Sequence, residues 1–148
     1  MVIDEKDRKI LRELLRDSRQ SFRRIARKVG LTTSTVVKRY KNLKKEGIIK
    51  KSTVLVDAEK IGYPLTATIE IRISKGKLSE VEKHISKKYH VISVYDVTGE
   101  FDALIIARFR NRKELNSFVK SLLSTEYIER TNTHFVLNTI KEDFSIPV

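Results

Sequence analysis

Residues 21–47, with the sequence SFRRIARKVGLTTSTVVKRYKNLKKEG, contain the pattern from which the N-terminal fold can be predicted. Apolar residues recur at helical spacing in both halves of this stretch. Gly30 stands between the halves, where a glycine can take the left-handed conformation that ends a helix, and the Thr32 hydroxyl can cap the next helix. Two helices joined by so short a turn predict a helix-turn-helix. Their apolar stripes are Phe22, Ile25, Ala26 and Val29 in the first helix and Val36, Tyr40 and Leu43 in the second.

Another helical pattern precedes this motif, and short apolar runs follow it. Asp4 can cap the preceding helix. The runs Ile48–Ile49 and Thr53–Val56 predict one or two short strands, so a winged helix-turn-helix is expected. We therefore expect a helix-turn-helix domain over residues 1–50 and a hinge strand or linker over residues 51–63. The apolar face of the first helix contains Ile10, Leu11, Leu14 and Leu15.

The positive charge of the chain is concentrated in its first part. The 148 residues include 31 Lys and Arg against 19 Asp and Glu, a formal net charge of +12. Residues 1–60 contribute 18 − 8 = +10, whereas residues 61–148 contribute 13 − 11 = +2. Such asymmetry indicates a nucleic-acid-binding part joined to a part with another role. A solvated lysine-rich surface would have the same composition. The prediction of nucleic-acid binding therefore depends on the helical motif that contains these charges.

The outward face of the motif has the side chains that DNA recognition uses. At 100° per residue, hydroxyls, lysines and an asparagine lie opposite the apolar stripe of the second helix. Short hydroxyl side chains can approach base edges, lysines can reach guanine or phosphate, and asparagine can bind adenine. Arginines of the preceding helix suit phosphates. The predicted DNA contacts are Thr32, Thr33, Ser34, Val37, Lys38, Lys41, Asn42 and Lys45, with Arg23, Arg24 and Arg27 on the preceding helix.

The second part of the chain alternates strand and helix patterns. Apolar and polar residues alternate strictly from Leu65 to Ile73, which predicts a strand with one buried face. The order βαββαβ favours a ferredoxin-like sandwich over residues 64–148, with an antiparallel sheet and both helices on one face. The whole chain is thus expected to be an α+β protein. The later expected elements are a helical stripe from Leu78 to Tyr89, strands Val91–Thr98 and Asp102–Phe109, a helical stripe from Leu115 to Leu123, and a strand Thr133–Ile140.

The sheet face without helices is predicted to be apolar as well. In the third strand, Leu104 and Ile106 lie on one face and Ala103, Ile105 and Ala107 on the other. A monomer would therefore expose an apolar patch, and a second copy is expected to cover it as a homodimer. The second strand is predicted to place Val91, Tyr95 and Val97 opposite Ile92 and Val94.

Several other classes of protein are disfavoured by the composition. The chain has no cysteine, and His84, His90 and His134 have no metal-ligand spacing, so neither a metal site nor a cofactor is expected. No phosphate-binding loop or nucleophile elbow occurs, and no catalytic residue is predicted. No apolar run is long enough to span a membrane, and we expect a cytoplasmic protein. The remaining alternative to a regulator is a non-specific architectural DNA-binding protein without an effector.

The order and spacing of several short motifs carry a family resemblance. In the first part they are Asp4–Asp7, Ile25-Ala26, Val29–Thr32, Thr35-Val36 and Gly47–Ile49; in the second they are Val97–Asp102 and Glu129–Thr133. With these motifs the chain resembles the Lrp/AsnC, or feast/famine, family of prokaryotic transcriptional regulators over essentially its whole length. The resemblance implies a DNA-binding helix-turn-helix, a hinge strand, and a ligand-sensing domain that dimerises through its sheet, with octamers as a further assembly.

The same resemblance implies an amino-acid effector. By position in the motifs, an acid of the turn would pair with the α-ammonium group, while turn amides and threonine hydroxyls would hold the carboxylate. Gly99 and Asp102 also have a simpler interpretation, as a turn glycine and a side chain that hydrogen-bonds the turn. The effector-site candidates are Thr98, Gly99, Glu100, Phe101, Asp102, Thr131 and Thr133.

Overall fold

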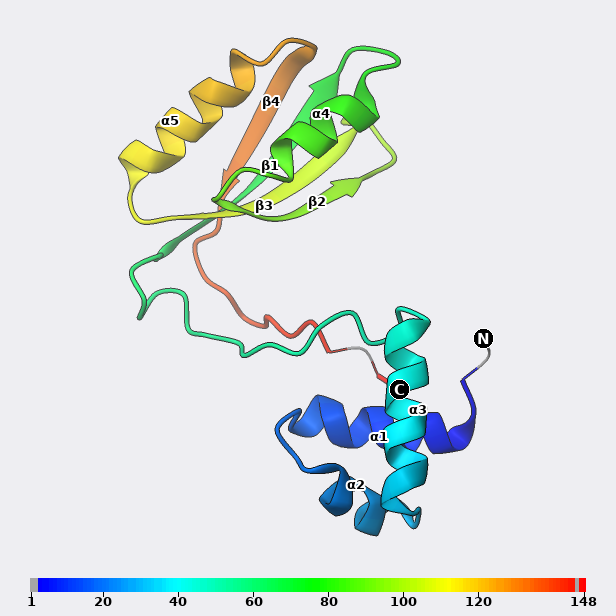
Figure 1. Cartoon of the computed structure of the whole chain (residues 1–148). Coiled ribbons are helices and arrows are strands. Elements are labelled where there is room, and N and C mark those ends of the chain that lie inside the picture. The colour runs from blue at the N-terminus through cyan, green and yellow to red at the C-terminus, as the bar shows by residue number, and fades with distance from the viewer. Residues whose placement is uncertain (1–2, 146) are drawn as a thin grey trace. The chain divides into compact units, whose positions relative to one another are not determined.

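The computed structural model describes residues 3–145 and 147–148, which form two compact units (Figure 1). One unit contains Met1–Leu55 together with Glu142–Val148, and the other contains Val56–Lys141. Each unit has its own cluster of buried apolar side chains. The two units are described separately below.

The first unit contains three helices, each started by a side-chain cap. They are α1 (Glu5–Arg16), α2 (Phe22–Val29) and α3 (Thr33–Lys45). Asp4 and Asp7 form a reciprocal capping box on α1, Ser21 caps α2, and Thr32 caps α3; such caps satisfy backbone N–H groups that have no partner inside the helix. Gly30 ends α2 with φ of 69°. The predicted helix-turn-helix is confirmed, and its main core cluster consists of Ile10, Ile25, Ala26 and Val36.

The short strands expected after α3 are not formed, so that part of the prediction is wrong. Residues 46–64, all of which are described, consist of turns and extended backbone without a strand. The side chains of Val54 and Leu55 are 72% and 73% exposed. An extended segment becomes a strand only when a neighbour supplies hydrogen bonds, and within the described part of the chain residues 50–56 make no backbone-to-backbone hydrogen bond. The described fold of the first unit is therefore a helix-turn-helix without a strand-built wing.

The second unit is a four-stranded antiparallel sheet covered on one face by two helices (Figure 1). The strand order is β2-β3-β1-β4 with antiparallel pairing throughout. The predicted βαββαβ order and ferredoxin-like arrangement are confirmed. The elements are β1 (Leu65–Ile73), α4 (Leu78–Ile85), β2 (Val91–Asp96), β3 (Ala103–Phe109), α5 (Arg112–Leu123) and β4 (Ile128–Phe135).

The last strand begins and ends earlier than its hydropathy pattern predicts. The expected strand was Thr133–Ile140, whereas β4 spans Ile128–Phe135. Its only neighbour is β1, and the pairing ends where Phe135 faces Ala67, followed by one hydrogen bond from Val136 to Thr66. Beyond that point only Leu65 of β1 remains. The extent of the partner strand, rather than local apolarity, sets this boundary.

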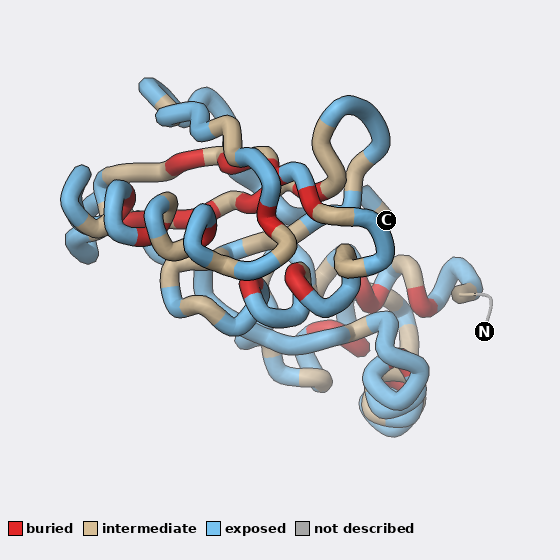
Figure 2. Tube along the Cα trace, turned by 90° about the horizontal axis from the view of Figure 1, so that it is seen from above, coloured by how far each residue is buried: buried red, intermediate tan, exposed pale blue. Residues whose placement is uncertain are grey.

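Burial alternates along the central strands, as Figure 2 shows. The helix-covered face of β1 and β3 is fully buried, with Ile69 and Ile105 at its centre. A bulge in β2 shifts its register, because Val91 faces Ala107 while Ser93 faces Ile106. Val91 and Val94 consequently both pack against the helix-side core. The predicted placement of these two residues on opposite faces is therefore wrong.

Candidate DNA-binding surface and effector site

The outward face of α3 is accessible along the length of the helix. Val36 and Leu43 are buried on the inner side, and the predicted contact residue Val37 is half-buried between the two faces. Hydroxyls occupy the N-terminal end of the outward face, and positive charge and one amide follow. The exposed residues among the predicted contacts on this helix are Thr33, Ser34, Lys38, Lys41, Asn42 and Lys45.

The hydroxyls at the start of α3 form a connected group. The Thr32 Oγ1 accepts a hydrogen bond from the backbone N–H of Thr35 at 3.2 Å. It also lies 3.0 Å from the Ser34 Oγ and 2.8 Å from the Thr35 Oγ1. These bonds restrict the rotation of the side chains at the N-terminal end of α3. This is the end of the helix from which base contacts are predicted. Thr32 itself, a predicted DNA contact, has its oxygen engaged in capping α3.

The predicted DNA-contacting cations of α2 and α3 are not paired with acids of this unit. Arg23, Arg24 and Arg27 are exposed. Among the described residues, no carboxylate oxygen lies within 4.0 Å of their charged nitrogens, nor of those of the three lysines on the outward face of α3. Three acids of the unit, Asp4, Asp7 and Glu13, instead form ion pairs at two places between the helices.

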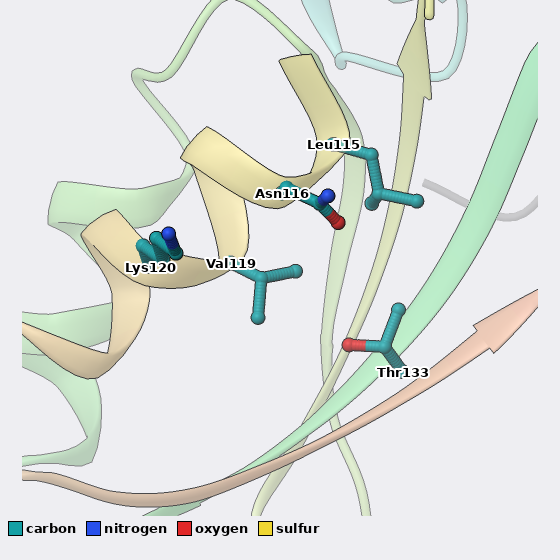
Figure 3. Close-up of a pocket in the computed structure, with 5 residues that line it drawn as sticks. All are labelled: Leu115, Asn116, Val119, Lys120 and Thr133. Carbon is teal, nitrogen blue, oxygen red and sulfur yellow. The ribbon is translucent and has the colours of Figure 1, made fainter. Parts of the chain in front are cut away.

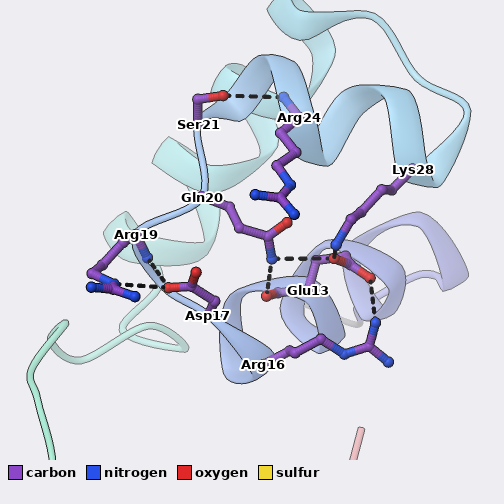
Figure 4. A network of polar contacts seen from close by, with 8 residues as sticks. All are labelled: Glu13, Arg16, Asp17, Arg19, Gln20, Ser21, Arg24 and Lys28. Atoms are coloured by element: carbon purple, nitrogen blue, oxygen red, sulfur yellow. Dashed lines mark hydrogen bonds and ion pairs between the residues drawn. The ribbon is translucent and has the colours of Figure 1, made fainter.

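One of these places is Glu13, which joins α1 to α2 (Figure 4). Its carboxylate accepts hydrogen bonds from the Lys28 ammonium and from the Gln20 amide, the latter at 3.2 Å, and pairs with Arg16 at 3.7 Å. The Lys28 hydrogen bond is the main reason that the pKa of Glu13 lies below its ordinary value. Lys28 is thereby held against α1, whereas the neighbouring arginines of α2 are not ion-paired within the described residues.

The other place is Arg39, which joins α3 to the start of α1. Its Nη1 donates to the Asp4 carboxylate at 2.8 and 2.9 Å and to the Asp7 carboxylate at 2.9 Å. Asp7 is only 5% exposed, the one charged residue in the buried set. The pKa of Asp4 is lowered mainly by the hydrogen bond from the backbone N–H of Asp7. Burial acts in the opposite direction, and Arg39 lowers the pKa further. The pKa of Arg39 is raised by its bonds to Asp7 and Asp4.

Sequence reasoning missed both of these ion-paired groups. Asp4 and Asp7 were expected only at the start of a helix, and nothing local to Arg39 indicates a partner 35 residues away. An arginine on the flank of a basic helix has the same local signature whether it contacts DNA or an acid. The pairing of acids with inner cations is what distinguishes Arg39 and Lys28 from the outward-facing residues.

The predicted effector turn between β2 and β3 is fixed mainly by its own hydrogen bonds. Gly99 has φ of 127°, a conformation that side-chain-bearing residues rarely adopt. The Asp102 carboxylate accepts from the backbone N–H of Ile73 at 2.7 Å, and its backbone N–H donates to the Ile71 carbonyl at 3.0 Å. The structural interpretation of Gly99 and Asp102 is thus satisfied within the chain.

Glu100 and Phe101 extend from the same turn toward β4. Glu100 pairs with the Arg130 guanidinium at 3.2 Å, and both side chains are more than 60% exposed. The guanidinium carbon lies 5.5 Å from the centre of the Phe101 ring. A cation held over an aromatic ring beside an acid is a polar site open to solvent. Thr98 precedes this group in the same turn and is exposed.

The two threonines of β4 lie apart from that group, on the helix side of the sheet. Thr131 pairs with Ile71 and Thr133 with Ile69, both of which face the core. Thr133 lines a pocket of about 260 Å³ between α5 and β4 (Figure 3). The effector candidates therefore form two groups rather than one. The other residues that line the pocket are Leu115, Asn116, Val119 and Lys120.

Sequence reasoning did not find the helical side of this pocket. Asn116 and Lys120 are four residues apart on α5, so they lie one above the other on the helix surface. This spacing was detectable, but on a solvent-facing helix it is commonplace. Only the position of β4 beside α5 gives the pair a shared pocket.

These features define a class of protein: a helix-turn-helix with an uncompensated cationic face, joined to an α+β domain with a small pocket. The comparisons with known families agree with this description. Residues 3–44 match the AsnC-type helix-turn-helix domain, and residues 66–146 match the Lrp/AsnC ligand binding domain. The chain belongs to the Lrp/AsnC family of transcriptional regulators, which confirms both the resemblance in the sequence and the expectation that the protein is not an enzyme.

Relatives match over nearly the whole chain. An uncharacterized HTH-type transcriptional regulator of Pyrococcus furiosus is 48% identical over 99% of this chain and 99% of its own. The HTH-type transcriptional regulator FL11 of Pyrococcus horikoshii is 36% identical over 99% of this chain and 97% of its own. A transcriptional regulator of Neisseria meningitidis, solved as an L-Met complex, is 31% identical with a TM-score of 0.88, covering 99% of this chain and 97% of that one. Within the described residues, no helix has the length and apolarity needed to cross a bilayer.

Replacement of Arg39 by glutamine is expected to destabilise the helical unit. The buried Asp7 carboxylate would lose its cationic partner, which costs about 1–3 kcal/mol. Thermal unfolding followed by helical circular dichroism measures the change. The control is Arg23→Gln, which removes an exposed arginine that has no ion pair within the described residues and should leave the melting temperature nearly unchanged. Equal melting temperatures for the two variants would contradict the assigned role of Arg39.

The helical unit is also expected to lose stability in acid. The pKa values of Asp4, Glu13 and Asp17 are lowered in the folded state from ordinary values of 3.8, 4.5 and 3.8. Their contribution is therefore fully present above those ordinary values and is lost as the pH falls through the folded ones. Urea unfolding between pH 7 and pH 2 measures this loss. Glu13→Gln should flatten the pH dependence below about pH 4.5, and an unchanged slope would exclude the Lys28–Glu13 contribution.

Proposed function

We propose that α2 and α3 bind duplex DNA in a sequence-specific manner, with α3 as the recognition helix. The observation that carries the proposal is the outward face of α3, where hydroxyls, an asparagine and uncompensated lysines share one exposed surface. The α2 arginines would contact phosphates beside the groove. The proposed organisation is a DNA-binding domain over residues 1–50, a linker over 51–63 and a sensing domain over 64–148, acting in the cytoplasm where such regulators meet DNA.

Sequence-specific binding is favoured over a non-specific architectural role. A protein that binds only phosphates needs cations, which bind every sequence alike. The outward face of α3 also presents Thr33, Ser34 and Asn42, whose polar side chains can hydrogen-bond base edges. These three residues are exposed and are not needed to cap the helix. Base contact is the use that best accounts for such residues on a cationic helix face.

Alanine at Asn42 or at Lys38 is expected to weaken binding to the promoter region of the protein's own gene. Loss of a bidentate base contact by Asn42 costs about 1–3 kcal/mol, or roughly 5- to 150-fold in affinity. Fluorescence anisotropy with promoter and scrambled duplexes measures both affinity and specificity. Lys9→Ala on α1 removes an equivalent exposed lysine and serves as the control. Promoter affinity that stays the same in both α3 variants would show that the recognition face has been misplaced.

We propose that the sensing domain binds an amino acid at the pocket between α5 and β4. The pocket combines the apolar side chains of Leu115 and Val119 with polar groups from Asn116, Lys120 and Thr133. An ammonium and a hydroxyl suit an α-carboxylate, while the apolar wall suits an uncharged side chain. The relative from Neisseria meningitidis was solved with L-Met, which supports an effector of the same kind here.

A second copy of the chain is proposed to complete this arrangement. The Thr98–Asp102 turn and the pocket form separate groups within one chain, so a turn supplied by a neighbouring copy would bring both groups to one ligand. The open sheet face has Leu104 and Ile106 at its centre, both half-buried, with Tyr95 46% exposed beside them. Such a surface suits a homodimer, and octamers would follow by further association of dimers.

Calorimetric titration with each of the twenty amino acids is expected to reveal at least one ligand. Thr133→Val should weaken its binding, because the variant keeps the shape but loses the hydroxyl. Ser117→Ala, which removes a hydroxyl from α5 outside the pocket lining, is the control. Sedimentation in parallel tests whether the ligand changes association. If none of the twenty binds, the amino-acid sensor role is rejected.

A further inference from the structure

Two loops of the sheet domain meet at the end of the sheet where the linker enters. Leu65 at the start of β1 faces Phe109 at the end of β3, and Val91 at the start of β2 faces Ala107. The loop before β2, residues 86–90, and the segment after β3, residues 110–114, therefore lie at this end. The linker arrives at the same end because it leads directly into β1.

Aromatic and polar contacts hold these segments together. The Tyr63 hydroxyl of the linker lies 2.6 Å from the Tyr89 hydroxyl. The Arg110 Nη2 donates to the Tyr63 hydroxyl at 3.0 Å, and its guanidinium carbon lies 5.2 Å from the Tyr63 ring centre. His90 stacks on the buried Phe109 ring at 5.0 Å. The loops are thus anchored to the domain core.

This end of the domain is strongly basic, although the domain as a whole is nearly neutral. Residues 86–90 and 110–114 contain five cations and one acid, giving 5 − 1 = +4. The remainder of residues 61–148 has 13 − 5 = 8 cations and 11 − 1 = 10 acids, giving −2. We call the five cations the linker-end basic cluster. Its members are Lys87, Lys88, Arg110, Arg112 and Lys113.

The single acid of these segments does not neutralise the cluster. Glu114 accepts a hydrogen bond from the backbone N–H of Arg110 at 2.9 Å and lies 3.6 Å from the His90 Nε2. Among the described residues, no carboxylate oxygen lies within 4.0 Å of the charged nitrogens of the five cations. Lys88 is half-buried, and the other four are exposed.

We propose that the linker-end basic cluster is a second DNA-binding surface, which contacts the phosphates of duplex flanking the site bound by α3. Lysine, arginine and tyrosine are among the side chains that bind phosphates. Tyr63 takes up one of the five N–H donors of Arg110, so others remain for an anion. The contact would carry no base preference and would add affinity on longer DNA.

Duplex DNA is the polyanion that the tether brings to this surface. Residues 46–56 separate the end of α3 from the turn that begins at Asp57. Residues 46–49 fold back on α3 through backbone hydrogen bonds. The seven residues that follow, 50–56, span up to about 23–25 Å when fully extended, which is about two-thirds of a helical turn of duplex. DNA held by α3 would therefore be presented to the cluster at high local concentration. The proposal rests on the DNA binding proposed above, and its test separates the two.

The test compares two variants of equal charge on two lengths of DNA. One carries Lys87→Gln with Lys113→Gln; the control carries Lys75→Gln with Lys83→Gln, two exposed lysines of the same domain outside the cluster. The duplexes are about 15 bp and about 60 bp, or roughly 1.5 and 6 helical turns, both centred on the footprinted promoter site. Affinity is measured against salt concentration from about 50 to 200 mM.

On the longer duplex, the cluster variant is expected to lose up to about 1.8 from the slope of log affinity against log salt, at about 0.9 per lost phosphate contact. On the shorter duplex its slope should equal that of the wild type, and the control should match the wild type on both. An unchanged slope on the longer duplex, or an equal loss on both lengths, would overturn the second surface. Wild-type protein that binds neither duplex would refute the proposed DNA-binding function itself.

Discussion

The bond between Arg39 and the paired aspartates of the α1 capping box is the contact that ties α3 to the start of α1. The core of the helical unit is small. Six apolar side chains are buried among its described residues, four of them in the main cluster, and a small unit buries only a modest fraction of its surface on folding. Arg39 bonds both carboxylates that start α1. One side chain thus links the N-terminus of α1 to the middle of α3.

This use of acids also shapes the electrostatics of the surface. Asp4 and Asp7 pair with Arg39, and Glu13 pairs with Lys28. These three acids therefore do not neutralise the cations on the outward faces of α2 and α3. The cations left over are those on the exposed sides of α2 and α3. The acids of α1 are thus used in ion pairs inside the unit. The same interactions that stabilise the helices keep the proposed DNA-binding side positive.

Local sequence patterns predicted an element correctly where neighbouring residues alone determine it. The caps, Gly30 and the apolar stripes gave the three helices, and strict alternation gave the bounds of β1 as observed. The wing strands, the end of β4 and the face of Val91 were predicted wrongly, because pairing partners and a bulge set them. The exposed residues of α3 were predictable from helix geometry. Arg39, Asn116 and Lys120 were not, since their neighbours are distant in sequence.

The division of charge along the chain illustrates the same limit. Summing over residues 61–148 gives +2 and suggests a neutral domain, yet the sheet brings two cationic segments together at one end and leaves the rest at −2. The segments that carry Lys87 and Lys113 lie at the same end of the sheet because β2 and β3 pair side by side. Net charge along a sequence identifies a basic surface when the charges share one helix. When strands bring the charges together, the sheet topology has to be known first.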